Sequence, residues 1–195
     1  MDMSISLEQV RKLRERTGAG VVDAKKALEE ADGDDAKALE LLKKRGLDKA
    51  QKKSDREANE GVVGSYIHGN GKVGVMVKLL CETDFVAKNE EFLELSRDIA
   101  MHIAAMQPEC LRPEDVEEGV VVKEREIWKE QVTGKSEEIL ENILKGKEKK
   151  FREERALLTQ PFVKNPDMTV GELVTQKIAK VGENIQVGEF VRYEL

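Results

Sequence analysis

Residues 61–80 read GVVGSYIHGNGKVGVMVKLL, and this stretch decides the fold class of the chain. Two runs rich in β-branched residues, 62–67 and 73–79, flank a short segment that contains Gly69, Asn70 and Gly71. Glycine and asparagine readily adopt the left-handed backbone conformations that a tight turn requires. The stretch therefore predicts a β-hairpin.

Upstream of the hairpin, the sequence predicts three short helices. Ser6 and Gln9 are spaced as a capping box, and the first helix then carries an apolar face at helical spacing. That face consists of Leu7, Val10 and Leu13. Glycines in the segment 17–20 end this helix. A second helix is expected over about 22–31, with Ala27 and Leu28 facing inward, and a third over 35–45, ending at Gly46.

The polar segment 47–60 separates these helices from the hairpin and predicts a helical or mobile linker. We therefore expect two domains: residues 1–52, a three-helix bundle with a basic linker helix, and residues 53–195, an α+β core. Residues 43–56 contain seven basic and two acidic side chains. This charge favours a solvated linker helix, and the alternative is a contact with acidic protein or RNA, although no aromatic residues are interleaved for base stacking.

Downstream of the hairpin, helical patterns alternate with a final strand. Asn89 is placed to cap a helix with one apolar stripe, formed by Phe92, Leu95, Ile99, Ile103 and Met106. Charged helical sequence follows over 121–158. Thr169 is placed to cap another helix that ends at Gly182, and residues 185–193 predict a strand. The fold class is therefore α+β: a small antiparallel sheet packed with helices, preceded by a helical bundle.

The composition predicts a soluble, cytoplasmic protein. The formal net charge of −6 argues against a protein that coats nucleic acid, and we expect no direct nucleic-acid binding. Cys81 and Cys110 form neither a metal-type pair nor a disulfide framework. The start of the chain lacks the basic and apolar regions of a signal peptide, and no apolar run approaches the roughly 20 residues that cross a membrane.

Patterns that suggest catalysis are weak. Glycines starting at Gly69 match the spacing G-x-G-x-x-G of dinucleotide-binding loops, but a strand follows where such a loop needs a helix. A thiol enzyme built from Cys81 and either His68 or His102 rests on residue types alone, and His102 is expected to make a local hydrogen bond in its helix. No cluster predicts a metal. We expect no catalytic residue, cofactor or metal.

The segment 81–88, CETDFVAK, is the most unusual in the chain. It lies between a predicted strand and a predicted helix, yet it contains an aromatic residue, Phe85. In one interpretation, favoured by composition, Thr83 or Asp84 caps a turn and Phe85 folds back on the core. In the other, the capped turn projects Phe85 toward a partner protein.

Two stretches resemble the elongation factor Ts family. Residues 13–28, LRERTGAGVVDAKKAL, are similar to its amino-terminal signature, and residues 81–92, CETDFVAKNEEF, are similar to its second signature. The resemblance continues through 66–68 (YIH), 160–164 (QPFVK) and 190–194 (FVRYE). It therefore covers essentially the whole chain in order.

The resemblance implies a guanine-nucleotide exchange factor for elongation factor Tu, the GTPase that delivers aminoacyl-tRNA to the ribosome. It implies that the amino-terminal bundle is similar to a ubiquitin-associated domain and docks on the GTPase. It also implies that a second segment inserts beside the magnesium site of the GTPase, with Phe85 as wedge and Asp84 as polar partner. The implied partner-binding residues are Thr17, Gly18, Ala19, Gly20, Val21, Val22, Thr83, Asp84, Phe85 and Val86.

The chain also departs from the family pattern. Lys78 and Leu80 stand where the second signature usually has Glu and Asn, which puts affinity in doubt more than activity. With 195 residues, the chain is expected to lack the second core half and the coiled-coil insertion of longer members. A single half-core leaves a sheet edge or an apolar face uncovered. We therefore expect a homodimer that binds two GTPases in a two-to-two complex.

Overall fold

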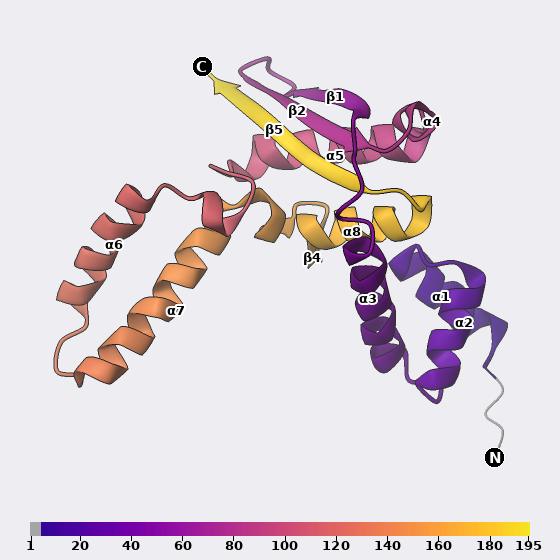
Figure 1. Ribbon diagram of the computed structural model, residues 1–195, viewed down its shortest axis with the longest axis horizontal. Coiled ribbons are helices and arrows are strands. Elements are labelled where there is room, and N and C mark those ends of the chain that lie inside the picture. Colours follow the sequence, from indigo (N-terminus) through magenta and orange to yellow (C-terminus); the bar gives the residue numbers. More distant parts are fainter. Residues whose placement is uncertain (1–4) are drawn as a thin grey trace. The chain divides into compact units, whose positions relative to one another are not determined.

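The computed structural model describes residues 5–195 (Figure 1). Residues 1–4, which belong to the first predicted domain and to the segment considered as a signal peptide, lie outside the described residues. The chain forms two compact units: unit 1 contains the described residues up to Val63 with 78–95 and 172–186, and unit 2 contains 64–77, 96–171 and 187–195. The predicted boundary between residues 52 and 53 is a different division and stays a prediction.

Unit 1 begins with the three predicted helices, α1 (Leu7–Thr17), α2 (Val21–Glu30) and α3 (Asp35–Gln51). The capping box is present, because the Gln9 amide donates to Ser6 Oγ over 3.1 Å and the Ser6 amide donates to Gln9 Oε1 over 3.0 Å. Small and aliphatic side chains form the core between the helices: Val10, Leu13, Ala24, Ala27, Leu28, Ala31 and Ala38. The three-helix bundle is thus confirmed.

Two details of the bundle differ from the sequence-based expectation. Leu7 does not face inward, since its side chain is 88% exposed and Ile5, ahead of the cap, packs against the core instead. Helix α3 does not end at Gly46 but continues to Gln51. Arg45 pairs with Glu30, and Lys49 pairs with a carboxylate of α2, so contacts on both sides of Gly46 offset its low helix propensity.

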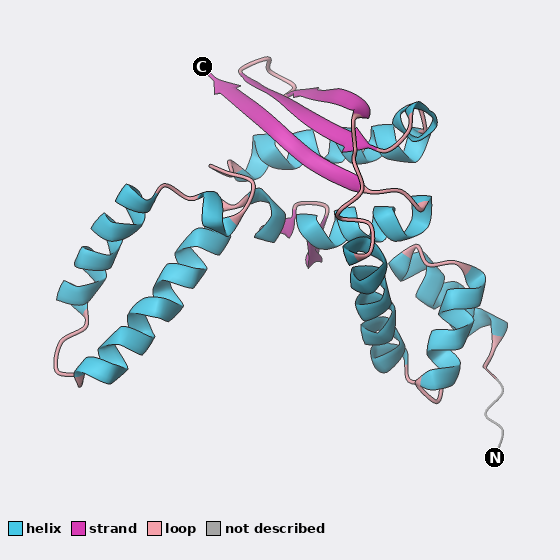
Figure 2. Cartoon of the chain, viewed as in Figure 1, coloured by secondary structure: helices cyan, strands magenta, loops and turns pink. Residues whose placement is uncertain are grey.

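The predicted hairpin consists of β1 (Glu60–Ile67) and β2 (Val73–Cys81), and β5 (Ile185–Glu194) joins it to give the order β1-β2-β5 (Figure 2). The His68 amide donates to Val73 O over 2.9 Å, and Gly71 has a φ of 70° that closes the turn. The Leu195 amide donates to Lys72 O over 3.0 Å, so the end of β5 lies beside the start of β2. The hairpin and the small antiparallel sheet are confirmed.

Helix α5 (Glu90–Met106) covers one face of this sheet (Figure 1). It begins as predicted, with the Glu91 amide donating to Asn89 Oδ1 over 2.8 Å. In β1, a side chain at Gly64 would place its Cβ 1.9 Å from Ser96 Oγ, so the strand and the helix meet where only glycine fits. In β5, Arg192 Nε donates to Ala104 O over 3.3 Å. Met106, expected on the buried stripe, is 42% exposed because it is the last residue of the helix.

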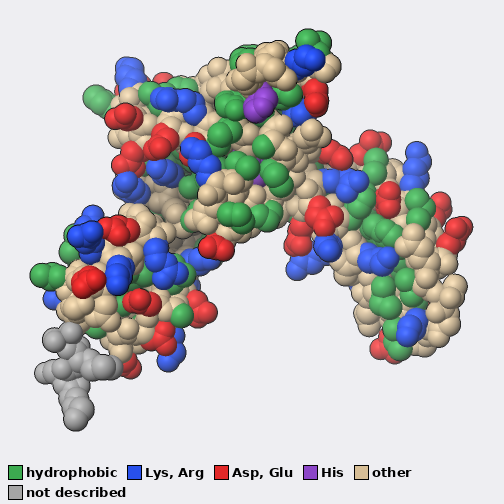
Figure 3. Space-filling model, turned by 180° about the vertical axis from the view of Figure 1, so that it is seen from behind, with side chains coloured by type: hydrophobic (Ala, Val, Ile, Leu, Met, Phe, Trp, Pro, Cys, Tyr) green, Lys and Arg blue, Asp and Glu red, His purple; other side chains and the backbone are tan. Residues whose placement is uncertain are grey.

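The charged sequence predicted as helical over 121–158 forms two helices in unit 2, α6 (Glu118–Gln131) and α7 (Glu137–Arg155). They make a hairpin around a small core of its own: Val116, Val121, Trp128, Leu144 and Phe151. Trp128 meets Phe151 edge to face, with ring centroids 5.5 Å apart. Hydrophobic side chains follow the length of this hairpin (Figure 3). That the chain lacks the second core half and the coiled-coil insertion of longer members stays a prediction.

The segment after α7 contains a second small sheet that the sequence did not predict. Strands β3 (Pro161–Phe162) and β4 (Asn165–Thr169) pair antiparallel, and α8 (Val170–Val181) follows. A buried histidine holds this segment: the Val163 amide donates to His102 Nδ1 over 3.2 Å, and His102 Nε2 lies 3.0 Å from Gln160 Oε1. The partners of His102 are therefore distant in sequence, not local as expected.

These contacts fit a neutral His102 with its proton on Nε2. An acceptor at Nδ1 and a donor at Nε2 use both ring nitrogens of the uncharged ring. Burial lowers the pKa of His102, and the hydrogen bond to Gln160 acts weakly in the opposite direction. The unfolded chain therefore takes up a proton at this residue more readily than the folded chain does.

We predict that the free energy of unfolding declines as the pH falls below about 6.5, the ordinary pKa of histidine. Because the pKa of His102 is lowered in the fold, its stabilising contribution is complete above that pH and is lost below it. In His102→Gln the pH dependence between about pH 7.5 and pH 5.5 should become shallower. Urea unfolding at several pH values measures this.

His68→Gln is the matched control, since His68 lies at the exposed hairpin turn and is the other histidine of the chain. Because His68→Gln leaves His102 in place, it should still lose stability as the pH falls below about 6.5. A wild-type stability that does not change over this pH range would contradict the prediction.

Candidate functional site

The segment 83–86 forms a capped single turn between a strand and a helix. Cys81 ends β2, and α4 (Asp84–Ala87) begins three residues later. Thr83 is the N-cap: its Oγ1 accepts from the Val86 amide over 3.4 Å, and its carbonyl accepts from the Ala87 amide over 3.1 Å. Ala87 is buried and anchors the turn. The expectation that Thr83 caps a turn is confirmed.

Phe85 points away from this anchor into solvent. Its side chain is 84% exposed, so the interpretation in which Phe85 folds back on the core is wrong. The physical reason is the register of the turn, because the small Ala87 takes the inward position and Phe85, two residues earlier, lies on the opposite side. Val86 is half-buried. A large exposed aromatic on a capped turn is a feature that folding alone does not require.

Asp84 stands next to Phe85 and carries a negative charge. Lys88 Nζ lies 2.8 Å from Asp84 Oδ2, one helical turn away. The hydrogen bond from Lys88 and its positive charge hold the pKa of Asp84 below its ordinary value. The turn therefore presents an aromatic ring and an ionised carboxylate side by side.

Glu183 holds the base of this turn from a distant part of unit 1. The Thr83 amide donates to Glu183 Oε2 over 3.1 Å, and Thr83 Oγ1 lies 2.7 Å from Glu183 Oε1. Sequence reasoning did not single out Glu183. The available signal was the predicted end of a helix at Gly182, which places the next residues in a turn but does not indicate what they contact.

The second group of candidate residues forms the turn between α1 and α2. Gly18 has a φ of 66°, and its amide donates to Arg14 O over 2.8 Å. Thr17 is buried, with Oγ1 donating to Leu13 O over 2.6 Å and accepting from the Ala19 amide over 3.3 Å. Thr17 and Gly18 therefore shape this turn from within.

The side chains that this turn offers to a partner are valines. Val21 and Val22, in the first turn of α2, are 53% and 64% exposed. Gly20 precedes them as the N-cap, and an added Cβ there would meet nothing within 4 Å. Ala19 is half-buried. In the predicted stretch 17–22, Thr17 and Gly18 thus build the turn, whereas Val21 and Val22 are exposed on its surface.

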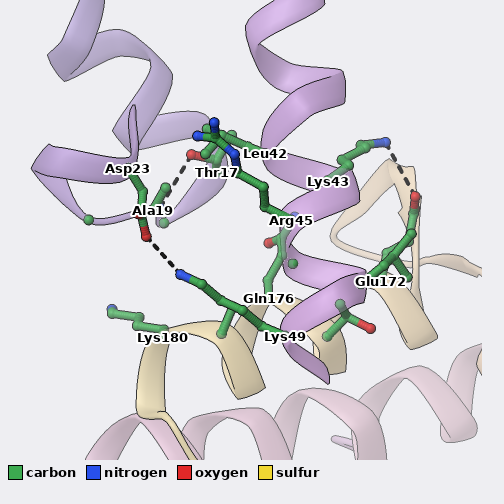
Figure 4. A pocket seen from close by; sticks show the side chains of 16 residues that line it. Thr17, Ala19, Asp23, Leu42, Lys43, Arg45, Lys49, Glu172, Gln176 and Lys180 are labelled. Atoms are coloured by element: carbon green, nitrogen blue, oxygen red, sulfur yellow. Dashed lines mark hydrogen bonds and ion pairs between the residues drawn. The ribbon is translucent and has the colours of Figure 1, made fainter. Parts of the chain in front are cut away.

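Beside this turn lies a cavity of about 90 Å³ lined by residues of α3 and α8, all in unit 1 (Figure 4). Lys49 Nζ lies 2.9 Å from Asp23 Oδ2, and this hydrogen bond lowers the pKa of Asp23. Lys43 Nζ lies 3.3 Å from Glu172 Oε1. These lysines pair within the chain, as the dashed lines of Figure 4 show.

The same pairing extends along the basic segment 43–56. Lys53 Nζ contacts Gly182 O, and Arg56 Nη1 lies 3.4 Å from Glu82 Oε1. The sequence had favoured a solvated linker helix over a contact with protein or RNA. In the structure the segment is helical as far as Gln51 and mostly exposed. Five of its seven basic side chains also form ion pairs or hydrogen bonds within unit 1: Lys43, Arg45, Lys49, Lys53 and Arg56.

Groups that might have supported catalysis are held in structural roles. Cys81 is buried, and burial, with the nearby charge of Glu183 as a second cause, raises the pKa of its thiol, which disfavours the reactive thiolate. Cys110 is half-buried, and both ring nitrogens of His102 have partners within the chain. Within residues 5–195, no three His, Cys, Asp or Glu residues are grouped so that they could hold a metal ion.

The glycine pattern that starts at Gly69 lies in the hairpin turn, and a strand follows it as expected. Among the helices of residues 5–195, none has the length and apolar character needed to cross a membrane.

Comparison with known proteins agrees with the two sequence motifs. The model of the family described as Elongation factor TS matches residues 36–195. The chain belongs to the elongation factor Ts family. An Elongation factor Ts of Carboxydothermus hydrogenoformans is 55% identical over 193 residues, which cover 98% of this chain and 89% of the relative. One of Rubrobacter xylanophilus is 52% identical over 195 residues, which cover 99% of this chain and 100% of the relative.

Membership of the elongation factor Ts family implies a translation elongation factor that acts in nucleotide exchange on elongation factor Tu. The family model begins at residue 36, so the motif at 13–28 lies outside that match, whereas the relatives cover nearly the whole chain. Lys78 and Leu80, which depart from the pattern expected for elongation factor Ts, both lie on β2 ahead of the Thr83 turn.

We predict that Phe85→Ala leaves the free energy of unfolding within about 0.5 kcal/mol of the wild type, because the side chain is already in water. Phe92→Ala is the matched comparison, since Phe92 is 1% exposed and its truncation should cost about 3–5 kcal/mol. Urea unfolding followed by circular dichroism measures both. A large loss of stability in Phe85→Ala would show that Phe85 packs in the fold.

Proposed function

We propose that this chain promotes release of GDP from elongation factor Tu by inserting residues 83–86 beside the magnesium and phosphate site of the GTPase. The observation that carries the proposal is the exposure of Phe85, 84%, on a turn that Thr83 caps and Glu183 holds. A turn whose backbone is held before binding loses less conformational freedom when it enters a partner than a flexible loop does. Phe85 acts as the wedge, and the charged Asp84 beside it is the polar partner.

The physical basis is that tight binding of GDP by the GTPase depends on the bound Mg²⁺. Mg²⁺ neutralises the charge of the bound phosphates and is commonly the largest local charge in such a site. Displacing it removes much of the attraction that holds GDP. The exchange factor makes and breaks no covalent bond in this mechanism, so it works without catalytic residues, cofactor or metal of its own.

Thermodynamic linkage explains how the factor leaves again. If the factor weakens nucleotide binding, nucleotide weakens binding of the factor by the same ratio. GTP, the more abundant nucleotide in the cell, then rebinds and expels the factor. Because the GTPase acts in translation, the proposed site of action is the cytoplasm.

The turn between α1 and α2 supplies a second contact with the GTPase domain. The exposed pair Val21 and Val22 offers apolar surface, while Thr17 and Gly18 fix the backbone that displays it. Ala19 and Gly20 leave the approach to this surface free of bulky side chains. Apolar side chains at the centre of a contact are typical anchors of protein interfaces.

We also propose that two copies pair through the open face of the sheet. In unit 2, α5 covers one face, while side chains on the other are exposed: Ile67 by 65%, Met76 by 52%, Val191 by 37% and Tyr193 by 71%. Several exposed apolar side chains on neighbouring strands are a feature of protein interfaces. A symmetric dimer would cover it and carry two GTPases.

The decisive experiment measures release of a fluorescent GDP analogue from elongation factor Tu in the presence of Mg²⁺ and catalytic amounts of the chain. The wild type should accelerate release, and Phe85→Ala should lose about 30-fold of that effect, the size of an interface hot spot. Leu7→Ala is the matched control, because Leu7 is 88% exposed and lies at the end of α1 remote from the Thr17 turn.

Each outcome of this experiment has a separate meaning. Acceleration that survives Phe85→Ala would keep the function but remove the wedge from the mechanism. Failure of the wild type with its cognate GTPase would contradict the proposed function.

The dimer is tested by sedimentation at micromolar concentration. The wild type should sediment as a particle of about twice the chain mass of 21.9 kDa. Met76→Glu should give the single-chain mass, because it would bury charge in the interface. Thr133→Glu, in the exposed connection between α6 and α7, should remain dimeric. A single-chain mass for the wild type would count against the pairing.

A further inference from the structure

Glu183 belongs to a reciprocal set of contacts between two segments that are far apart in sequence. The Thr83 amide donates to the Glu183 carboxylate over 3.1 Å, and the Asn184 amide donates to the Glu82 carboxylate over 2.6 Å. Each segment therefore supplies one carboxylate and one backbone amide. All four residues lie within unit 1.

The position of these contacts explains their chemistry. Strands β2 and β5 are neighbours, with β2 ending at Cys81 and β5 beginning at Ile185, so the backbone pairing stops just before residues 82 and 184. Beyond the ends of the strands, the backbone amides of Thr83 and Asn184 donate to side-chain carboxylates of the opposite segment. The two glutamates thus serve as the acceptors, with hydrogen bonds that their charge strengthens.

A third segment secures the side that carries Glu183. Asn184 is 2% exposed, and its Nδ2 donates to Arg56 O over 2.8 Å. Gly182 ends α8 with a φ of 86°, a left-handed conformation that turns the chain toward the next two residues. The carboxylate of Glu183 is thus presented from a fixed backbone.

Glu183 makes a second contact that bears directly on the turn. Thr83 Oγ1 lies 2.7 Å from Glu183 Oε1 and also accepts from the Val86 amide. A hydroxyl that donates to the carboxylate keeps its lone pairs free for the amide at the start of α4. The carboxylate therefore orients the hydroxyl that caps the turn on which Phe85 stands.

We infer that Glu183 is a positioning residue for nucleotide exchange, fixing the Thr83 cap and through it the direction of Phe85. This inference rests on the proposed function. It assigns Thr83 a role within the chain, because its amide and hydroxyl are bound to Glu183 and are not offered to the GTPase. Asp84 and Phe85 remain the residues that meet the partner.

The test combines exchange assays with a measurement that needs no partner. At saturating amounts of factor, Glu183→Ala should slow the accelerated release of the GDP analogue by about tenfold, the effect of losing an oriented contact. Glu183→Gln should be intermediate, since it keeps an acceptor oxygen at only one of the two positions that meet the Thr83 amide and hydroxyl. Glu94→Ala, which removes an exposed carboxylate of α5, is the control and should match the wild type.

A double-mutant cycle separates positioning from general loss of stability. If Glu183 acts through Phe85, adding Glu183→Ala to Phe85→Ala should change exchange by less than about twofold. Equal slowing in both backgrounds would overturn the inference. A Glu183→Ala variant that accelerates GDP release as fast as the wild type would also overturn it. If Glu183→Ala fails to fold by circular dichroism, the same cycle with Glu183→Gln decides.

Hydrogen exchange of the free chain distinguishes this inference from the proposed function. Backbone amides of 83–88 should exchange faster in Glu183→Ala than in the wild type, while those of the α1–α2 bundle are unchanged. Unchanged hydrogen exchange at residues 83–88 in Glu183→Ala would overturn the inference, even if the wild type accelerates GDP release from the GTPase. If the wild type does not accelerate release of GDP from the GTPase, the proposed function is overturned. The role of Glu183 in nucleotide exchange is then overturned as well.

Discussion

The pairing of β2 with β5 is the constraint on which the candidate site depends. It brings the residues after β2 beside the residues before β5, and Thr83 meets Glu183 across 100 positions of sequence. The sheet therefore does more than build a core. Its central strand delivers a short turn to the surface, and its last strand delivers the groups that hold this turn. Helix α5 fills the space behind the sheet, so the exposed Phe85 stands on a supported backbone.

The amino-terminal half of unit 1 shows how a densely charged sequence is used. Lys43, Lys49 and Arg56 each pair with a carboxylate from another segment of the same unit. Single exposed pairs of this kind contribute little to stability, typically less than about 1 kcal/mol each. Their number and direction nonetheless specify which surfaces face one another. A run of basic residues that suggests an external acidic partner is here satisfied largely from within.

Sequence reasoning succeeded where the determining interactions are local. The capping box at Ser6, the hairpin turn at Gly71 and the cap at Asn89 each depend on residues within a few positions, so the pattern contains the whole cause. The motif around Phe85 was recognised by its resemblance to a family, and composition alone favoured the wrong orientation of the ring. The Phe85 ring is exposed because Ala87 occupies the inward position of the turn.

Reasoning failed where a distant partner decides. Helix α3 passes Gly46 because side chains of α2 bind it on both sides, and His102 bonds to residues some 60 positions away. Glu183 is one of many glutamates in the sequence, and only the pairing of β2 with β5 shows that it contacts Thr83. Strands β3 and β4 are short and are joined by two residues, so they carry too little periodicity to be seen.

The separation between Thr83 and Glu183 has a consequence for the time at which the site forms during synthesis. A ribosome produces residues 5–106, and with them the bundle, the hairpin and α5, long before it reaches residue 183. Until β5 emerges, the cap at Thr83 lacks its carboxylate and β2 lacks one of its neighbours. The turn on which Phe85 stands can therefore complete its contacts only after residue 183 has been synthesised.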